Sequence, residues 1–224
     1  MTITALSECI GRLCAEGAAE QRNANARSRI SDGDMAVEHV VTVFKQALRR
    51  LGIADYVIRR SLRFVHAPHA QCATTDLDVM VVTPFGAFVV CVMSLQGNVE
   101  PGPNTETLIA ACGEGEPMLH TSPVRRHAAV LRSLRSLLSV YECPVEGLAI
   151  AAATPCQIHP LLPESILAPD ELYHYLRLRL LRFFDIGRPH VVVLQVVDAI
   201  DRRSENQVSI NVGAASRGSR ERDV

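Results

Sequence analysis

The sequence predicts an α/β protein in which helices cover a mixed β-sheet. Short apolar runs bounded by turn residues, typical of buried strands, alternate with longer segments whose apolar residues recur at helical intervals. The order of these segments (helix, hairpin, helix, strand, helix, strand) is that of a sheet with helices on its faces. With 224 residues, 48% of them hydrophobic and 21% charged, the chain is long enough for one sizeable core of this kind.

Two helices are expected before the first strand. Residues 3–20 carry apolar side chains at helical intervals, which predicts a short amphipathic helix followed by a polar linker. Asp34 is expected to cap a second helix, and Gly52 to end it. Residues 1–32 are therefore assigned to an N-terminal helix and linker, and residues 33–212 to the main domain.

The remaining elements follow from apolar runs and turn signals. We expect strands over residues 56–65, 77–83, 87–93, 105–111, 148–153 and 190–197, and an edge strand over residues 204–212. Ser122 and Pro123 begin a helix that continues to residue 138, with the serine as N-cap, and another helix is expected over residues 171–184. The polar tail, residues 213–224, is expected to be disordered.

Charge and cysteine content restrict the class of protein. The formal net charge of −1 provides no overall field toward nucleic acid or an anionic membrane. Seven cysteines, an odd number with no signal peptide before them, indicate reduced thiols and a cytoplasmic protein, which we expect to be bacterial. Pro84 and Gly86 interrupt the longest apolar stretch, residues 79–95, so we expect two strands and no membrane span.

The hairpin predicted between Thr75 and Glu100 carries a recognisable motif. Asp78 begins its first strand, and Thr83-Pro84-Phe85-Gly86 forms the turn. This hairpin resembles that of nuclease-related (NERD) domains of the PD-(D/E)XK superfamily, which begins with Asp and ends with Glu-x-Lys. In this chain, Cys91 stands at the position of the glutamate and Met93 at that of the lysine.

The resemblance extends on both sides of the hairpin and covers roughly residues 33–185. Glu38 is similar to the acid of the family's first helix, although Val37 precedes it where the family usually has glycine. Residues 122–126 resemble the family's Asn-Pro-x-x-Gln helix opening, with Arg126 in place of the glutamine. The resemblance implies a three-layer α/β/α restriction-endonuclease-like core with a mixed sheet and an N-terminal helical extension.

The two substitutions in the hairpin predict a degenerate active site. Cleavage of a phosphodiester with Mg²⁺ needs converging carboxylate oxygens and a group that orients water and balances charge. The sulfur atoms of Cys91 and Met93 are poorly matched to this hard ion. Asp78 remains as the one candidate metal ligand of the hairpin, so we expect no cofactor, or Mg²⁺ if the protein is active.

Relocated groups could restore the site. Lys45, the only lysine in the chain, lies seven residues after Glu38 and shares its helical face, and Glu100 could replace the missing acid. The alternative, which we favour, is that Lys45 is solvated and Glu100 belongs to a turn.

Two other groups of residues contain side chains that can bind zinc or act as a nucleophile. His66, His69 and Cys72, with Cys156 and His159, have ligand types suited to zinc, but without paired Cys-x-x-Cys spacing a polar connection is favoured. Cys91 could be a reactive thiol beside Arg126, but a buried cysteine acting as a small hydrophobic residue is favoured.

Arginines cluster on the two later predicted helices. Arg125, Arg126 and Arg132 are candidate nucleic-acid contacts, and Arg135, Arg177, Arg179 and Arg182 add to the same pattern. The near-neutral total charge and the aromatic content of 4% favour solvated or partner-contacting faces over a nucleic-acid interface.

The sequence therefore predicts a non-enzymatic scaffold that binds a protein partner or belongs to a larger assembly, in a DNA-processing or DNA-transfer context. A metal-dependent endonuclease with a rearranged site, and a DNA-binding module that does not cleave, remain as alternatives.

Overall fold

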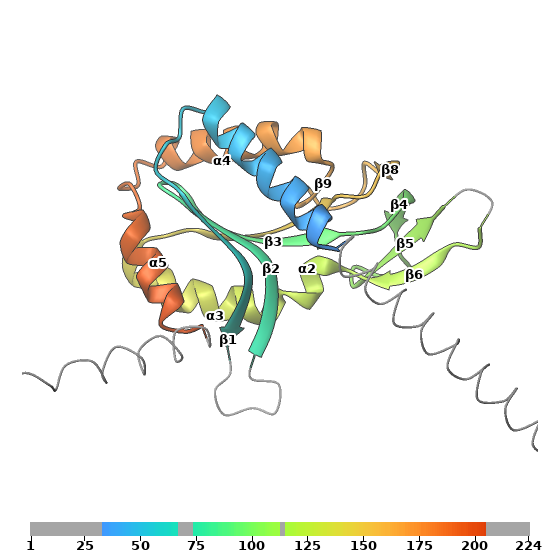
Figure 1. The fold of residues 1–224 in the computed structure, drawn as a ribbon, viewed down its shortest axis with the longest axis horizontal. Coiled ribbons are helices and arrows are strands. Elements are labelled where there is room, and N and C mark those ends of the chain that lie inside the picture. Colours follow the sequence, from blue (N-terminus) through green and yellow to red (C-terminus); the bar gives the residue numbers. More distant parts are fainter. Residues whose placement is uncertain (1–32, 67–73, 113–114, 205–224) are drawn as a thin grey trace, which may run out of the picture.

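The computed structural model of the chain describes residues 33–66, 74–112 and 115–204. The helix expected over residues 3–20, the edge strand expected after Ser204 and the tail lie outside these residues. Within them the protein is mixed α/β, as predicted, with two mixed sheets and helices packed against them (Figure 1). None of the described helices is long and apolar enough to cross a membrane.

The larger sheet has five strands in the order β1-β2-β3-β7-β9. Strands β1, β2 and β3 form an antiparallel meander, β7 runs parallel to β3, and β9 parallel to β7. The bounds are Val57–Val65 for β1, Thr74–Thr83 for β2, Gly86–Met93 for β3, Val145–Ala151 for β7 and Ile166–Leu167 for β9.

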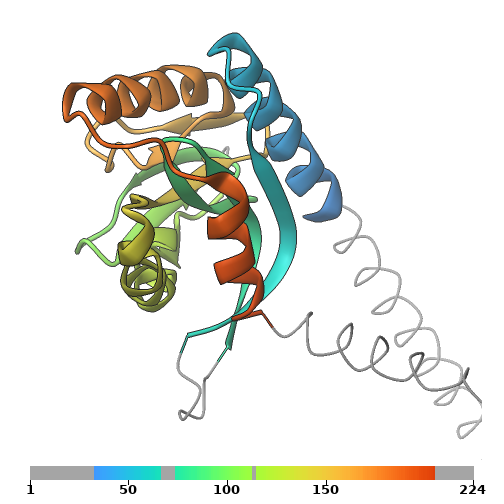
Figure 2. The same ribbon diagram turned by 90° about the vertical axis from the view of Figure 1, so that its left-hand side faces the viewer.

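The central strands are apolar on both faces because helices cover both faces of the sheet. One face carries the helix of residues 33–50 and α4 (Leu172–Asp185), and the other carries α2 (Pro123–Arg126), α3 (Ala128–Leu138) and α5 (Val193–Asp201) (Figures 1 and 2). Short 3-10 turns, Ser139–Tyr141 and Pro169–Glu171, complete the helical elements.

The helix of residues 33–50 packs through one apolar face. Its buried side chains, each at most 4% exposed, recur at helical spacing: Val40, Val41, Phe44, Ala47 and Leu48. Gly52 follows with φ +72°, a backbone conformation that side chains disfavour, and this confirms the predicted end of the helix. Residues 33 and 34 are already helical, so Asp34 lies within the helix and the prediction that it caps the helix is wrong.

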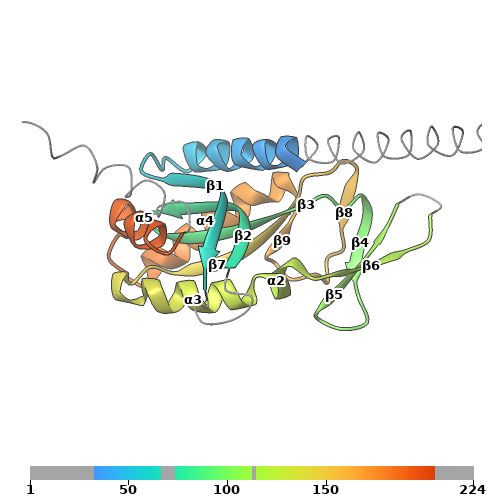
Figure 3. The same ribbon diagram turned by 60° about the horizontal axis from the view of Figure 1, so that its bottom comes forward.

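A smaller sheet extends from the end of β3 (Figure 3). Its order is β6-β5-β4-β8, with bounds Met118–Thr121, Thr107–Ala111, Gly97–Pro101 and Cys156–Ile158 respectively. Gly97 has φ +79°, and a Cβ there would lie 1.9 Å from the carbonyl oxygen of Ala111. Strand β4 therefore begins at a residue that approaches β5 too closely for any side chain.

Two predicted elements differ from the structure. The strand expected over residues 190–197 is wrong, because helix α5 begins at Val193. Its buried residues Val193, Val196, Val197 and Ile200 have helical spacing, which the run of valines conceals. The single helix expected from Pro123 to residue 138 is two helices, α2 and α3, separated at His127.

Candidate functional site

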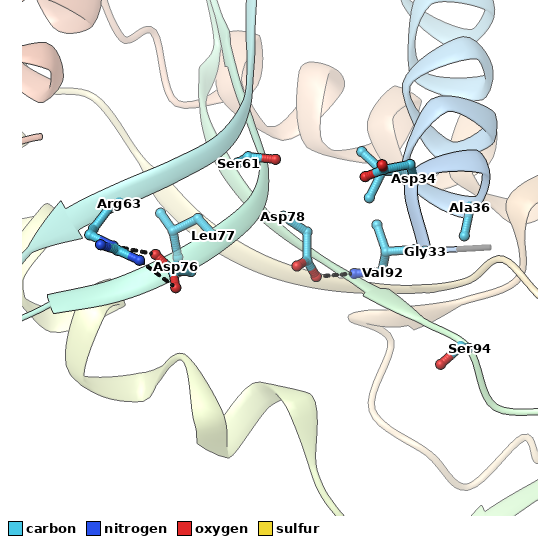
Figure 4. Close-up of a pocket in the computed structure, with 11 residues that line it drawn as sticks. Gly33, Asp34, Ala36, Ser61, Arg63, Asp76, Leu77, Asp78, Val92 and Ser94 are labelled. Carbon is cyan, nitrogen blue, oxygen red and sulfur yellow. Dashed lines mark hydrogen bonds and ion pairs between the residues drawn. The ribbon is translucent and has the colours of Figure 1, made fainter. Parts of the chain in front are cut away.

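Strands β2 and β3 separate at the point where the motif residues lie. Their pairing includes Val79 with Val90, a register that places Asp78 across from Cys91. Beyond this point the Asp78 carboxylate takes the position of a strand partner, because its Oδ2 accepts a hydrogen bond from the backbone N–H of Val92 at 2.8 Å (Figure 4). As predicted, Asp78 and Cys91 lie on adjacent antiparallel strands, with the cysteine buried.

A hollow of about 650 Å³ opens beside Asp78. It lies between the start of the helix of residues 33–50, the strands β1 and β2, and the end of β3 (Figure 4). The residues that line it are Gly33, Asp34, Ala36, Val37, Ser61, Arg63, Asp76, Leu77, Asp78, Val92 and Ser94. Three carboxyl groups thus line one cleft.

Two of the three carboxylates have hydrogen-bond partners within the protein. Arg63 Nε donates to Asp76 Oδ1 at 2.8 Å, and this hydrogen bond holds the pKa of Asp76 below its ordinary value. Asp78 already accepts the Val92 N–H. Asp34 is therefore the one carboxylate of the cleft that forms no hydrogen bond or ion pair with another described residue.

Cys91 and Met93, the two residues expected to replace a glutamate and a lysine, lie inside an apolar cluster. Cys91 is fully buried and Met93 is 5% exposed. Their cluster joins the large sheet to the small one, and its other members are Val99, Leu108, Ala149, Ala151 and Ile166. Neither side chain is among the residues that line the hollow. This side of β3 is therefore occupied by apolar packing.

Cys91 is held as a neutral thiol. Burial raises its pKa, and the nearby Asp78 carboxylate adds to this, while Arg126 acts in the opposite direction. The Arg126 guanidinium nevertheless contacts the thiol, since Nη2 donates to Sγ at 2.8 Å. The net direction favours the predicted interpretation of a packed cysteine over a nucleophile.

His127 is a buried polar residue near Arg126 and Asp78 that was not predicted from the sequence. It stands between α2 and α3 and is 4% exposed. Burial, and then the charge of Arg126, lower its pKa, although the Asp78 carboxylate opposes the shift. The imidazole is therefore held neutral beside a guanidinium and a carboxylate. The only sequence signal was the histidine's place directly after Arg126.

The candidate replacement groups lie elsewhere. Glu38 is exposed and pairs with Arg60 of β1. Lys45 is exposed on the same helix, and Glu100 is exposed in β4, where it pairs in register with Ile109. None of these three is among the described residues that line the hollow. Asp34, one helical turn before Glu38, does line it, and helical periodicity could have identified it.

Among the described residues, no group of three or more His, Cys, Asp or Glu residues is arranged to hold an ion. Two carboxylates of the cleft, Asp78 and Asp76, accept hydrogen bonds from Val92 and Arg63 respectively. Of the zinc candidates, His69 and Cys72 lie outside the described residues, and His66 Nε2 is 2.9 Å from the Thr75 hydroxyl.

The candidate nucleic-acid residues are dispersed. Arg125 pairs with Glu106 at 3.0 Å, Arg126 contacts Cys91, and Arg135 Nε donates to the Val145 carbonyl oxygen. Arg125 lies on α2 and Arg132 on α3, beyond the break at His127. Arg132 lines a separate hollow with Arg203.

Comparison of the chain with models of known protein families, with curated proteins and with solved structures found no match. The fold and the site therefore define an α/β protein with a carboxylate-lined cleft at a strand fork.

Proposed function

We propose that this chain is a catalytically inactive, nuclease-related module that serves as a scaffold for a partner protein in DNA processing or DNA transfer. The observation that carries the proposal is the burial of Cys91 and Met93 in an apolar cluster next to the surviving Asp78. A nuclease would need a carboxylate and a cation on this stretch of β3, facing a metal and water.

The strand order supports the relationship to PD-(D/E)XK proteins. The resemblance implies a core in which a first helix precedes a hairpin, followed by another helix and a further strand. The helix of residues 33–50, strands β1 to β3, helices α2 and α3, and strand β7 follow that order. Under this proposal the motif lies on two strands. Asp78 of β2 corresponds to the motif aspartate, and Cys91 and Met93 of β3 correspond to the glutamate and the lysine.

The chemistry of the cleft supports inactivity. A metal nuclease needs at least two free carboxylates and a group that manages protons. In the cleft, Asp78 and Asp76 are hydrogen bonded within the protein, and Lys45 does not line it. The specific observation in favour of a rearranged endonuclease is Asp34, which lines the same cleft as Asp78.

A cleavage assay tests both proposals. Supercoiled plasmid and single-stranded DNA are incubated with the full chain and Mg²⁺ or Mn²⁺, alongside Asp78→Ala and Asp34→Ala variants. We expect no cleavage by any of them. Cleavage by the wild type that both variants lose, while their thermal unfolding remains cooperative, would establish the rearranged endonuclease instead. Cleavage that both variants retain would indicate a contaminating nuclease.

A further inference from the structure

A second hollow lies at the other end of strands β2 and β3, where the Pro84–Gly86 turn joins them. Its volume is about 270 Å³. Its walls come from the turn, from β3, from the start of β7 and from the C-terminal part of α4. This second hollow shares no lining residue with the cleft beside Asp78.

Aromatic side chains form the apolar part of this hollow. Phe85, Phe88 and Phe183 line it, and each is at most 4% exposed. Phe85 and Phe88 pack edge to face with ring centroids 5.6 Å apart, which fixes both rings. Ile186, 67% exposed, adds an apolar rim. A ligand with a ring would bury apolar area here against rigid neighbours.

Guanidinium groups supply the polar part. Arg179 pairs with Glu146 of β7, its Nε lying 2.8 Å from Oε2, and its guanidinium carbon lies 4.6 Å from the centroid of the Tyr175 ring. Tyr175 also donates to Glu146. The single carboxylate of the lining therefore has partners already.

Two further arginines leave the hollow with excess positive charge. Arg182 and Arg188 line it, and neither forms a side-chain hydrogen bond or an ion pair with another described residue. The nearest acid in sequence, Asp185, is exposed and is not among the lining residues. Unpaired guanidinium groups beside an apolar floor favour an anion that carries an apolar body.

We propose that this hollow binds a small organic anion consisting of an aromatic ring and a phosphate or carboxylate group. Its volume lies just below the range of about 300–1,000 Å³ that is usual for small-molecule sites, so the ligand is of single-ring size. The ring packs on Phe85 and Phe183, and the anionic group pairs with Arg182 and Arg188. This site is independent of the function proposed for the cleft at Asp78.

Phenyl phosphate is the probe, since it joins both chemical features. We titrate it into the full chain and follow backbone amide signals by NMR, with inorganic phosphate and phenol as single-feature controls. We expect phenyl phosphate to bind about tenfold more tightly than either control, because each contributes only one kind of contact. The shifted amides should belong to residues 85–88, 145–146 and 179–188.

Matched variants on α4 make the test specific. Arg182→Gln should weaken phenyl phosphate binding by about fivefold to tenfold. Arg177→Gln, exposed on the same helix and absent from the lining, should leave it unchanged. Thermal unfolding of both variants controls for folding. Absence of binding at millimolar probe, equal loss in the two variants, or shifts confined to the hollow of Arg132 and Arg203 would each overturn the proposal.

Discussion

The guanidinium of Arg126 lies 2.8 Å from the sulfur of Cys91, so that a cation from α2 contacts a buried thiol on β3. Under the proposed relationship to nuclease-related domains, these two residues replace a glutamine and a metal-binding glutamate. The proposal then implies that the two replacements contact each other. A carboxylate introduced at residue 91 alone would form an ion pair with Arg126 and would be less available to a metal ion.

This contact predicts how metal binding can be restored. Cys91→Glu with Met93→Lys should destabilise the fold by about 3–5 kcal/mol, because both positions are buried. In that double variant Glu at 91 pairs with Arg126, so Mn²⁺ should raise the melting temperature little. Adding Arg126→Gln should allow Mn²⁺ to raise it clearly, measured by thermal unfolding with and without the ion.

The control for this series is Asp78→Ala in the triple variant, which should abolish the Mn²⁺ effect, since Asp78 supplies the other carboxylate. An equal Mn²⁺ effect in the wild type and the triple variant would contradict the assignment of the motif to β2 and β3.

Weak DNA binding is expected at physiological salt. Arg125 is paired with Glu106, Arg126 contacts Cys91, and the net charge is −1. Two of the three candidate contacts are therefore engaged within the protein, which reduces the number of counterions that this face would release from phosphates. Fluorescence anisotropy with a labelled duplex should give a dissociation constant weaker than about 1 μM, with a shallow salt dependence. Submicromolar affinity with a steep salt slope, lost on Arg125→Ala with Arg132→Ala, would favour the DNA-binding alternative.

Local sequence signals predicted most of the larger sheet. The hairpin of β2 and β3 was predictable because two apolar runs surround a turn, and Thr83 stabilises that turn through its hydroxyl, which donates to the Gly86 carbonyl at 2.9 Å. The α5 error has the opposite cause. A continuous run of valines shows no period, and only the packing of α5 against α3, β1 and β2 selects the helix.

The site was predictable only where a motif marked it. Asp78 was identified from the hairpin pattern, whereas Asp34 and His127 were missed because tertiary packing brings Asp34 to the cleft and His127 near Asp78. Glu38 was chosen from the family pattern, yet it pairs with Arg60 on the neighbouring strand. Sequence spacing gives the helical face, but the position of the helix along the sheet decides which turn lies at the cleft.

Removal of one hydroxyl tests the network beside the second hollow. Tyr175 donates to Glu146 and accepts from Arg179 at 3.1 Å. Tyr175→Phe should lower the free energy of unfolding by about 1–3 kcal/mol, since it leaves a partly buried carboxylate with one partner fewer. Urea denaturation measures this change. Tyr173→Phe, a partly buried tyrosine on the same helix, is the matched control and should change stability less.

Thiol labelling as a function of pH tests the burial of the core cysteines. Burial raises the pKa of Cys143 to about 12, from an ordinary value of 9.0, and also raises that of Cys91. The pKa of the Cys143 thiol is therefore higher in the folded protein than in the unfolded one. Its contribution to the free energy of unfolding is complete below pH 9 and is lost as the pH rises toward 12. Iodoacetamide at pH 8, followed by peptide mass spectrometry, should modify the exposed Cys112 and leave Cys91 and Cys143 unmodified. Above pH 9 the free energy of unfolding should fall, and Cys143→Ala should make that fall less steep. Rapid labelling of Cys91 in the folded protein at pH 8 would instead indicate an activated thiol beside Arg126.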